Sequence, residues 1–249
     1  TYNKNSCLSK ISIVNMTYGW DGNELLNQPI NLTINSGDHI LIKGMSGCGK
    51  TSLLNVITGF SKPISGSVYL DVDNISKKAH SDDNPQYLPM LSTKISIVSQ
   101  ETLLFNNTLI FNITLQEDNN LIDYDLLSEV LYISCLSEVV SKLPNQEYAL
   151  IGENEHKMSS GQVQRLNWAR SLYQKPDLLL LDEPTGALDT KTEAEIFERL
   201  KNISKKMTII CISHSDDLDK FFTRKFLIHD KVLHSSNVIE NHVNNYGTS

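Results

Sequence analysis

The segment that most constrains this chain is GMSGCGKT at positions 44–51, which matches the pattern G-x-x-x-x-G-K-[ST] at every fixed position. An apolar run from His39 to Lys43 precedes it and has the pattern of a short buried strand. The residues from Lys50 to Thr58 place their apolar side chains at helical spacing. The sequence therefore predicts a strand, a loop and a helix in succession. A glycine-rich turn that binds nothing is rare in this setting.

The composition of this loop points to phosphate chemistry. Its three glycines, at positions 44, 47 and 49, let the backbone turn tightly and aim its N–H groups inward, where they and the next helix N-terminus can bind phosphate oxygens. Lys50 can bring a positive charge to the β- and γ-phosphates, and the Thr51 hydroxyl can ligate Mg²⁺. We interpret Cys48 as a tolerated small residue rather than a redox switch. The loop therefore predicts a nucleotide site.

A second motif lies far downstream, where four leucines at positions 178–181 are followed by Asp182 and Glu183. A buried strand that ends there places two carboxylates at the carboxyl edge of a sheet, which is where open α/β sheets bind ligands. One carboxylate can hold Mg²⁺ while the other orients or deprotonates a water. A simple helix cap is the alternative. Pro184, next in sequence, and the glycine loop argue against that alternative.

The order of the periodic segments predicts one α/β domain over residues 1–249. Two short strands, 11–14 and 30–34, form a small sheet at the start. Strands that alternate with helices later in the chain imply a parallel sheet covered on both faces. We expect an α/β core at 1–100 and 166–249, which includes the small sheet, and an inserted helical subdomain at 101–165. The further elements expected are helices at 126–136, 162–172 and 192–200 and a strand at 208–212.

Composition argues against several other classes. Asp and Glu number 29 against 22 Lys and Arg, and the net charge of −7 leaves no basic face for nucleic acid or an anionic membrane. No apolar stretch approaches the roughly 20 residues that span a bilayer, so we expect this chain itself to be soluble. The four cysteines form no C-x-x-C or C-x-x-H pair, which indicates a reducing cytosol rather than a disulfide framework or zinc site. Because the chain starts with Thr1 rather than Met, we expect a fragment of something longer.

Taken in order, these motifs resemble the nucleotide-binding domain of an ATP-binding cassette (ABC) transporter over nearly the whole chain. The resemblance implies a P-loop NTPase (RecA-like) core with a parallel sheet, an N-terminal antiparallel β subdomain and an inserted α-helical subdomain. The matching segments are the Walker A loop at 44–51, the Q-loop at Gln100, the signature at 158–162, the Walker B end at 182–183, the D-loop at 186–189 and the switch histidine at 214.

The same resemblance implies a role for individual residues. Glu183 and His214 are expected to be catalytic, with Glu183 polarising the attacking water and His214 holding the γ-phosphate. Tyr18 is expected to stack on adenine, Gln100 to couple to the membrane domain, and Asp189 to communicate across a dimer. The expected Mg²⁺ ligands are Thr51, Gln100 and Asp182. The expected ATP contacts are Tyr18, Gly44, Ser46, Gly47, Cys48, Gly49, Lys50, Thr51, Ser52, Gln100, Ser159, Gly161 and Gln162.

Two stretches favour exporters over importers within this family. LFNNTLIFNI at 104–113 resembles the exporter pattern LF-x-x-T-I-x-x-N-I, and IGE at 151–153 resembles the exporter X-loop VGE. The signature departs from LSGGQ, because Met158 replaces leucine and Ser160 replaces the first glycine. Ser160 adds a side chain where the backbone approaches the partner's γ-phosphate. Gly186 stands where exporters usually have serine.

The resemblance implies an ATPase on the cytoplasmic face of a membrane. It is expected to dimerise head to tail around two ATP, with Mg²⁺, and to associate with exporter transmembrane domains that are fused or separate. An alternative is a degenerate, mainly ATP-binding regulatory cassette in a heterodimer. A soluble cassette ATPase that works on ribosomes or DNA is a third reading, which the acidic charge, the single cassette and the exporter-like segments oppose. The substrate and the homo- or heteromeric state stay open.

Overall fold

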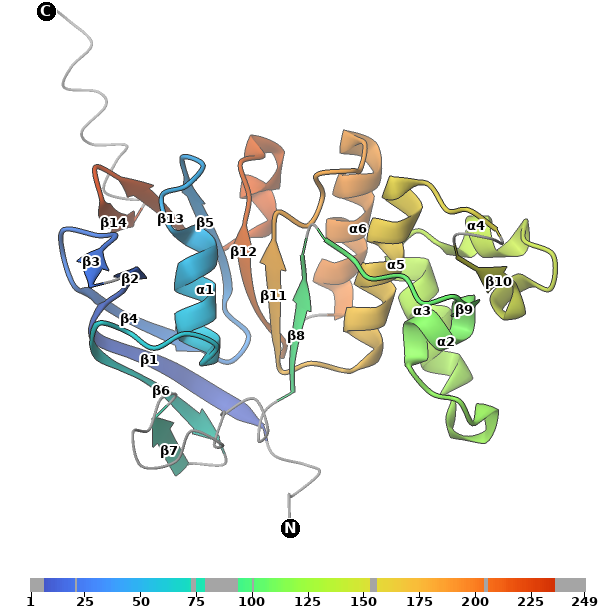
Figure 1. Cartoon of the computed structure of the whole chain (residues 1–249), viewed down its shortest axis with the longest axis horizontal. Helices are drawn as coiled ribbons and strands as arrows, with labels where there is room; N and C mark the ends of the chain where they lie inside the picture. Colours follow the sequence, from blue (N-terminus) through green and yellow to red (C-terminus); the bar gives the residue numbers. More distant parts are fainter. Residues whose placement is uncertain are drawn as a thin grey trace, which may run out of the picture.

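The computed structural model describes residues 7–20, 22–72, 75–78, 94–99, 101–152, 156–203 and 206–235. Within these residues, six strands form a central sheet in the order β14-β13-β5-β12-β11-β8, and all neighbouring pairs are parallel except β13 with β14 (Figure 1). The strands are β5 (His39–Gly44), β8 (Ile95–Val98), β11 (Leu178–Asp182), β12 (Thr208–Ile212), β13 (Arg224–His229) and β14 (Val232–Ser235).

The central strands are apolar along their length because both faces of the sheet are covered. In β11, Leu178 and Leu180 belong to one hydrophobic core, while Leu179 and Leu181 belong to the other. All four side chains are buried. The predicted parallel sheet with two covered faces is therefore confirmed.

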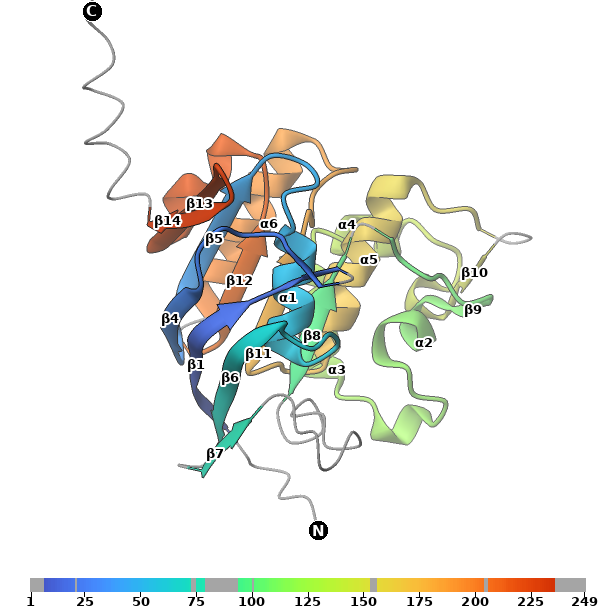
Figure 2. The same cartoon turned by 60° about the vertical axis from the view of Figure 1, so that its left-hand side comes forward.

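One of the two cores is closed by a second sheet. Four strands of the described part form this antiparallel sheet in the order β4-β1-β6-β7. Helix α1 (Lys50–Thr58) packs its apolar side chains between the two sheets (Figure 2). The strands are β1 (Leu8–Thr17), β4 (Ile30–Asn35), β6 (Ser65–Val72) and β7 (Ile75–Lys78), and a small hairpin follows β1 with β2 (Gly19–Trp20) and β3 (Asn23–Glu24).

The other core joins the sheet to helices. Helices α5 (Ser160–Tyr173) and α6 (Thr190–Ile203) cover this face, and a group of short helices packs against α5 (Figure 1). That group contains α2 (Leu109–Thr114), α3 (Tyr124–Ile133), α4 (Ser137–Ser141), the 3₁₀ turns at Asn119–Leu121 and Gln146–Tyr148, and the short pair β9 (Asn107–Thr108) and β10 (Leu150–Ile151). A further 3₁₀ helix, η4 (Asp216–Phe221), follows β12.

Helix α5 ties this core to the carboxyl end of β11. Trp168 is fully buried, and its indole N–H donates to the carbonyl oxygen of Pro184 at 3.0 Å. The indole ring meets Phe197 of α6 edge to face, with 5.5 Å between ring centroids. One side chain therefore fixes both the loop after β11 and the packing of α5 on α6.

The sequence-based element boundaries are close to those observed. Helix α1 and strand β12 span the expected residues, while the helix expected at 126–136 ends at Ile133 because Cys135 has a left-handed backbone with φ of 56°. Strands β6 and β13 had not been expected. The division at 100/101 and 165/166 remains a prediction. Among the described residues, no helix is long and apolar enough to cross a bilayer.

Trp168→Phe should lower the free energy of unfolding by about 2 kcal/mol, because it leaves a cavity and an unpaired carbonyl oxygen at Pro184. Urea unfolding followed by circular dichroism measures this change. Trp20, the second of the chain's two tryptophans, is 60% exposed, so Trp20→Phe is the matched control and should leave the unfolding midpoint unchanged. Equal midpoints for the two variants would contradict the role given to Trp168.

Candidate functional site

A cleft of about 300 Å³ opens where β5, β11 and β12 end. Its walls come from the glycine loop (residues 44–51), the ends of β11 and β12, and the hairpin after β1. The lining residues are Trp20, Leu25, Ser46, Gly47, Gly49, Lys50, Thr51, Ser52, Asp182, Glu183, Ile212 and His214. The structure thus brings together nine of the residues that the sequence predicts for the site.

The glycine loop has the conformation expected of an anion site. Gly49 precedes α1 with φ of 95°, and a Cβ there would lie 2.7 Å from Leu25 Cδ1, so both the backbone angle and the packing require glycine. Gly49 gives α1 no side-chain cap. The first N–H groups of α1 therefore lack a capping side chain, and a phosphate group is a ligand that such a helix N-terminus can bind.

Lys50 lies in the hollow of this loop and is only 7% exposed. Its ammonium donates to the carbonyl oxygens of Gly44 at 2.8 Å and Met45 at 3.0 Å. It also lies 3.3 Å from Nε2 of His214. The loop's own carbonyl groups therefore hold a positive charge beside the open helix N-terminus.

Glu183 has an unusual backbone conformation. Its φ of 48° is in the left-handed region, which costs a non-glycine residue roughly 1–3 kcal/mol. The surroundings stabilise this conformation, because the Glu183 N–H donates to the carbonyl oxygen of Ile212 at 3.0 Å and Pro184 accepts from Trp168. Strained backbone of this kind is common at functional sites.

The Glu183 carboxylate faces the switch histidine. Its Oε1 lies 3.1 Å from Nε2 of His214, the same nitrogen that faces Lys50. Glu183 Oε1 has no hydrogen-bond partner among the described residues, and Nε2 can accept from Lys50 when it carries no proton. The imidazole is therefore placed between the loop lysine and the candidate general base.

The oxygen atoms in the cleft suit Mg²⁺. Thr51 and Asp182 line the same cleft and offer a hydroxyl and a carboxylate, which are the hard ligands that Mg²⁺ prefers. Among the described residues, no group of three or more His, Cys, Asp or Glu side chains could hold a metal ion on its own. A Mg²⁺ ion here would therefore need further oxygens from a phosphate ligand or water. Gln100, the third expected ligand, lies outside the described residues.

The expectation for Tyr18 is wrong. Its ring is 1% exposed and packs in the core under Gly49, so neither ring face is open to a ligand. Burial raises the pKa of its phenol well above the usual range. The aromatic side chain at the cleft is instead Trp20, two residues later. Its position directly before the Asp-Gly pair at 21–22 is the sequence signal that could have identified it.

Two further loop residues that were predicted to contact ATP do not line the cleft. The Cys48 side chain packs against the core that contains α1. Gly44 begins the loop, and a Cβ there would lie 2.8 Å from Cys48 Sγ. Both residues therefore shape the loop from behind, and any contact that they make with a ligand would come from the backbone.

The signature segment (residues 158–162) lies elsewhere. Ser159 and Gln162 form a capping box at the start of α5: the Gln162 N–H donates to Ser159 Oγ at 3.3 Å, and the Ser159 N–H donates to Gln162 Oε1 at 2.9 Å. Ser160 is exposed, and a Cβ at Gly161 would lie 3.0 Å from the Ala187 carbonyl oxygen. No residue of this segment lines the cleft of its own chain.

Asp189 has a structural task in the isolated chain. Its carboxylate accepts from the N–H of Thr192 at 2.9 Å and from the Thr192 hydroxyl at 2.7 Å, and so caps α6. These hydrogen bonds lower the pKa of Asp189. Gln164 of α5 accepts from the Ala187 N–H at 2.8 Å. The loop at 186–189 is therefore anchored to α5 and α6, while Asp189 itself is exposed.

Comparison with known proteins gives one family. Residues 27–186 match the family model described as ABC transporter. Among the similar curated proteins, the ATP-dependent lipid A-core flippase of Ralstonia nicotianae is 35% identical over 202 residues, which cover 81% of this chain and 33% of the flippase. The flippase of Syntrophus aciditrophicus is 34% identical over 205 residues, or 82% of this chain and 32% of that protein. This chain therefore spans about a third of these relatives.

A solved structure shows the same fold. A bacterial Atm1-family ABC exporter with ATP bound matches 97% of this chain and 42% of its own chain, with a TM-score of 0.77 and 24% sequence identity. The predicted fold class, a P-loop NTPase core with an antiparallel β subdomain and a helical subdomain, is thereby confirmed.

We expect Trp20→Ala to weaken ATP binding roughly tenfold, because a base that stacks on an aromatic ring gains about 1–3 kcal/mol. Tyr18→Phe should bind ATP as the wild type does, since the buried Tyr18 hydroxyl has no hydrogen-bond partner among the described residues. Equilibrium titration with a fluorescent ATP analogue measures both constants. Unchanged ATP affinity in Trp20→Ala would contradict the assignment.

Proposed function

The chain belongs to the ABC transporter family, and on that premise we propose that it is the ATP-hydrolysing motor domain of an exporter. One observation carries the proposal: the loop lysine, two magnesium-type oxygen ligands, a strained glutamate and a histidine all meet in one cleft. This set of groups has the parts that phosphoryl transfer to water requires, namely positioning and charge stabilisation.

In the proposed reaction, the N-terminus of α1 and Lys50 bind the β- and γ-phosphates of ATP, and Trp20 stacks on the adenine. Mg²⁺, when bound by Thr51 and Asp182, would neutralise charge on the phosphates. Glu183 orients and polarises the attacking water. His214 donates to the γ-phosphate, and its contact with Glu183 keeps the two groups on the same side of the cleft. ADP and phosphate are the products.

We further propose that two chains form the working unit. The signature segment is exposed at the start of α5 and absent from the lining of its own cleft, so a second chain must supply it to complete the site. In a head-to-tail dimer, Ser159, Gly161 and Gln162 of one chain would face the γ-phosphate held by the other, and Asp189 would lie near the shared surface. ATP would then favour the closed dimer by binding both partners.

The proposed partners are the transmembrane domains of an exporter, on the same or another chain, with this domain at the cytoplasmic face of the membrane. Two exposed apolar side chains on the segment before α2 support such a contact, Leu103 and Phe105. The transport activity of the flippase relatives belongs to proteins about three times as long.

A second candidate is a regulatory cassette that binds ATP and hydrolyses little. The observation that favours it is Ser160, which is exposed at the first position of α5, where a dimer partner would approach. The intact pair of Glu183 and His214 favours the motor instead. The rate of ATP hydrolysis decides between the two.

Glu183→Gln should slow steady-state ATP hydrolysis by roughly 10²-fold or more, as expected for loss of a general base. ATP affinity should change little, because the amide keeps the shape of the side chain. Phosphate release against ATP concentration measures both parameters. Glu198→Gln, the same change at an exposed position of α6, is the control and should keep wild-type turnover. Unchanged turnover in Glu183→Gln would remove Glu183 from this role.

Two inactive variants should restore activity when mixed. Lys50→Ala disables a chain's own cleft, whereas Ser160→Glu places a negative charge against the partner's γ-phosphate and suits a helix N-terminus. In a mixed head-to-tail dimer, one site receives both changes and the other receives neither. Random mixing should therefore recover up to about a quarter of wild-type activity.

In the same assay, the specific activity of the wild type should rise with protein concentration. No recovery in the mixture, with full wild-type activity at every dilution, would indicate that one chain hydrolyses ATP alone.

A further inference from the structure

Lys43 is the last residue before the glycine loop, and its strand has the strand of the switch histidine as a neighbour. Ile42 of β5 pairs with Ile212 of β12. Lys43 directly follows Ile42 in the chain, and His214 follows Ile212 by two residues. The glycine loop and the segment of residues 213–219, which we call the switch segment, therefore leave neighbouring strand ends.

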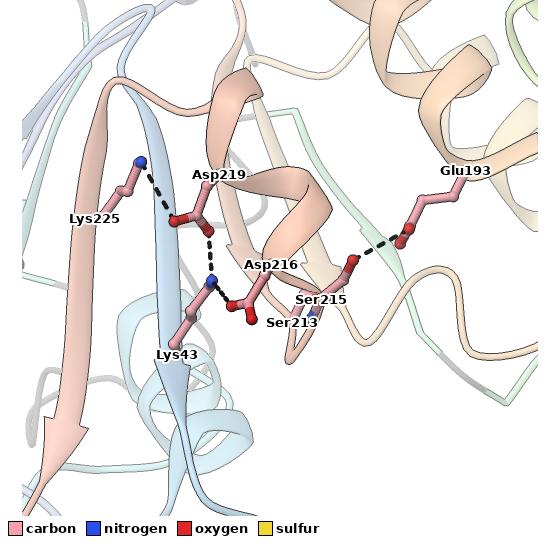
Figure 3. Close-up of polar contacts among 7 residues, drawn as sticks. All are labelled: Lys43, Glu193, Ser213, Ser215, Asp216, Asp219 and Lys225. Carbon is pink, nitrogen blue, oxygen red and sulfur yellow. Dashed lines mark hydrogen bonds and ion pairs between the residues drawn. The ribbon is translucent and has the colours of Figure 1, made fainter. Parts of the chain in front are cut away.

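The Lys43 side chain extends from the end of β5 to the switch segment (Figure 3). Its Nζ lies 2.6 Å from Asp216 Oδ1 and also contacts Asp219 Oδ1. The other oxygen of Asp219 lies 3.4 Å from Nζ of Lys225 on β13. Two carboxylates of η4 are therefore held by lysines from two adjacent strands of the central sheet.

The other flank of the switch segment is also held. Ser215 Oγ donates to Glu193 Oε2 at 3.2 Å, and its N–H donates to Ser213 Oγ at 3.1 Å. Glu193 is buried on α6, and its second oxygen accepts from the hydroxyl of Thr185. Figure 3 shows Lys43 on one side of the segment and Glu193 on the other.

Both attachments follow His214 directly in sequence, at Ser215 and Asp216, and on its other side Ser213 Oγ accepts from the Ser215 N–H. The His214 side chain is half-exposed, and among the described residues its Nε2 contacts Glu183 and Lys50, two contacts that a bound phosphate would rearrange. The backbone around it must therefore determine where the imidazole lies when those contacts change.

We propose that Lys43 is a positioning residue for ATP hydrolysis: by binding Asp216 and Asp219, it fixes the switch segment against the glycine-loop strand and so places the His214 imidazole. This inference rests on the proposed function, because it assumes that His214 acts on the γ-phosphate. Lys43 itself does not line the cleft.

Lys43 and Asp216 carry opposite charges at neutral pH, so their contact persists there. Burial alone lowers the pKa of Lys43, whose side chain is 21% exposed, but hydrogen bonds to Asp216 and Asp219 outweigh burial and raise it. The Lys43 ammonium in turn lowers the pKa of Asp216. Asp216 is 96% exposed, so this one pair is worth little for stability. We therefore expect the Lys43–Asp216 pair to affect the geometry of the switch segment rather than the stability of the fold.

The kinetic test compares Lys43→Gln, Lys43→Arg and the wild type in the full chain at a concentration that gives dimers. Lys43→Gln should lower kcat roughly tenfold, because a small displacement of a catalytic group is costly, while KM for ATP stays within about twofold. Lys43→Arg keeps the charge and should recover most of kcat. In a His214→Ala background, Lys43→Gln should have no further effect, since both changes act through one group.

The structural test measures the environment of the His214 imidazole by proton NMR. The C2–H resonance of its imidazole, identified by its loss in His214→Ala, should shift in Lys43→Gln and return in Lys43→Arg. Asp216→Asn combined with Asp219→Asn keeps Lys43 and should give the same shift, which covers the case in which Lys43→Gln fails to fold. Lys142→Gln removes an exposed ion pair of the same kind, with Glu138, and should move neither the resonance nor kcat.

The outcomes separate this inference from the proposed function. An unmoved His214 resonance in folded Lys43→Gln overturns the inference, whatever happens to kcat. A moved resonance with unchanged kcat also overturns it, because the displaced imidazole would then not matter for hydrolysis. If the wild type hydrolyses no ATP but the resonance still moves, the proposed function fails and the placement of His214 by Lys43 stands.

Discussion

The parallel pairing of β5, β12 and β11 brings three chain segments to one edge of the central sheet. Ile42 lies beside Ile212, and Asp182 lies beside Ile212 on the other side, so the glycine loop, the glutamate and the histidine leave adjacent strand ends. The cleft exists because these ends are in register. A slip of one residue in either pairing would turn the buried side chains of a strand to the wrong core and also separate Lys50 from Glu183.

The edge is supported mainly from the helical side. Three side chains of α5 make hydrogen bonds to this edge. Trp168 bonds to the loop after β11, Asn167 bonds to the end of β8, and Gln164 bonds to the loop at 186–189. The signature segment begins the same helix. A force on the signature from a dimer partner would therefore reach the Glu183 backbone through one rigid element, and the left-handed φ of Glu183 is a conformation that such contacts must maintain.

The predictions from sequence succeeded where the signal was local. The glycine loop required α1 to start at Lys50, and four consecutive leucines required a strand covered on both faces. They failed where the answer depended on packing between distant segments. Tyr18 and Trp20 are two residues apart in sequence, but Tyr18 is buried beneath Gly49 of the glycine loop, whereas Trp20 is exposed at the cleft.

The linear order of residues was enough to establish the family, the order of the motifs, the acidic charge and the helices and strands next to the motifs, because glycine conformation, apolar period and helix caps act over a few residues. The remoteness of the signature from its own cleft and the reach of Lys43 to the switch segment are visible in the folded chain alone. So is the position of His214 between Lys50 and Glu183. Lys43 and Asp216 are 173 positions apart and Lys50 and His214 are 164 apart, and sheet register and core packing alone determine that they meet.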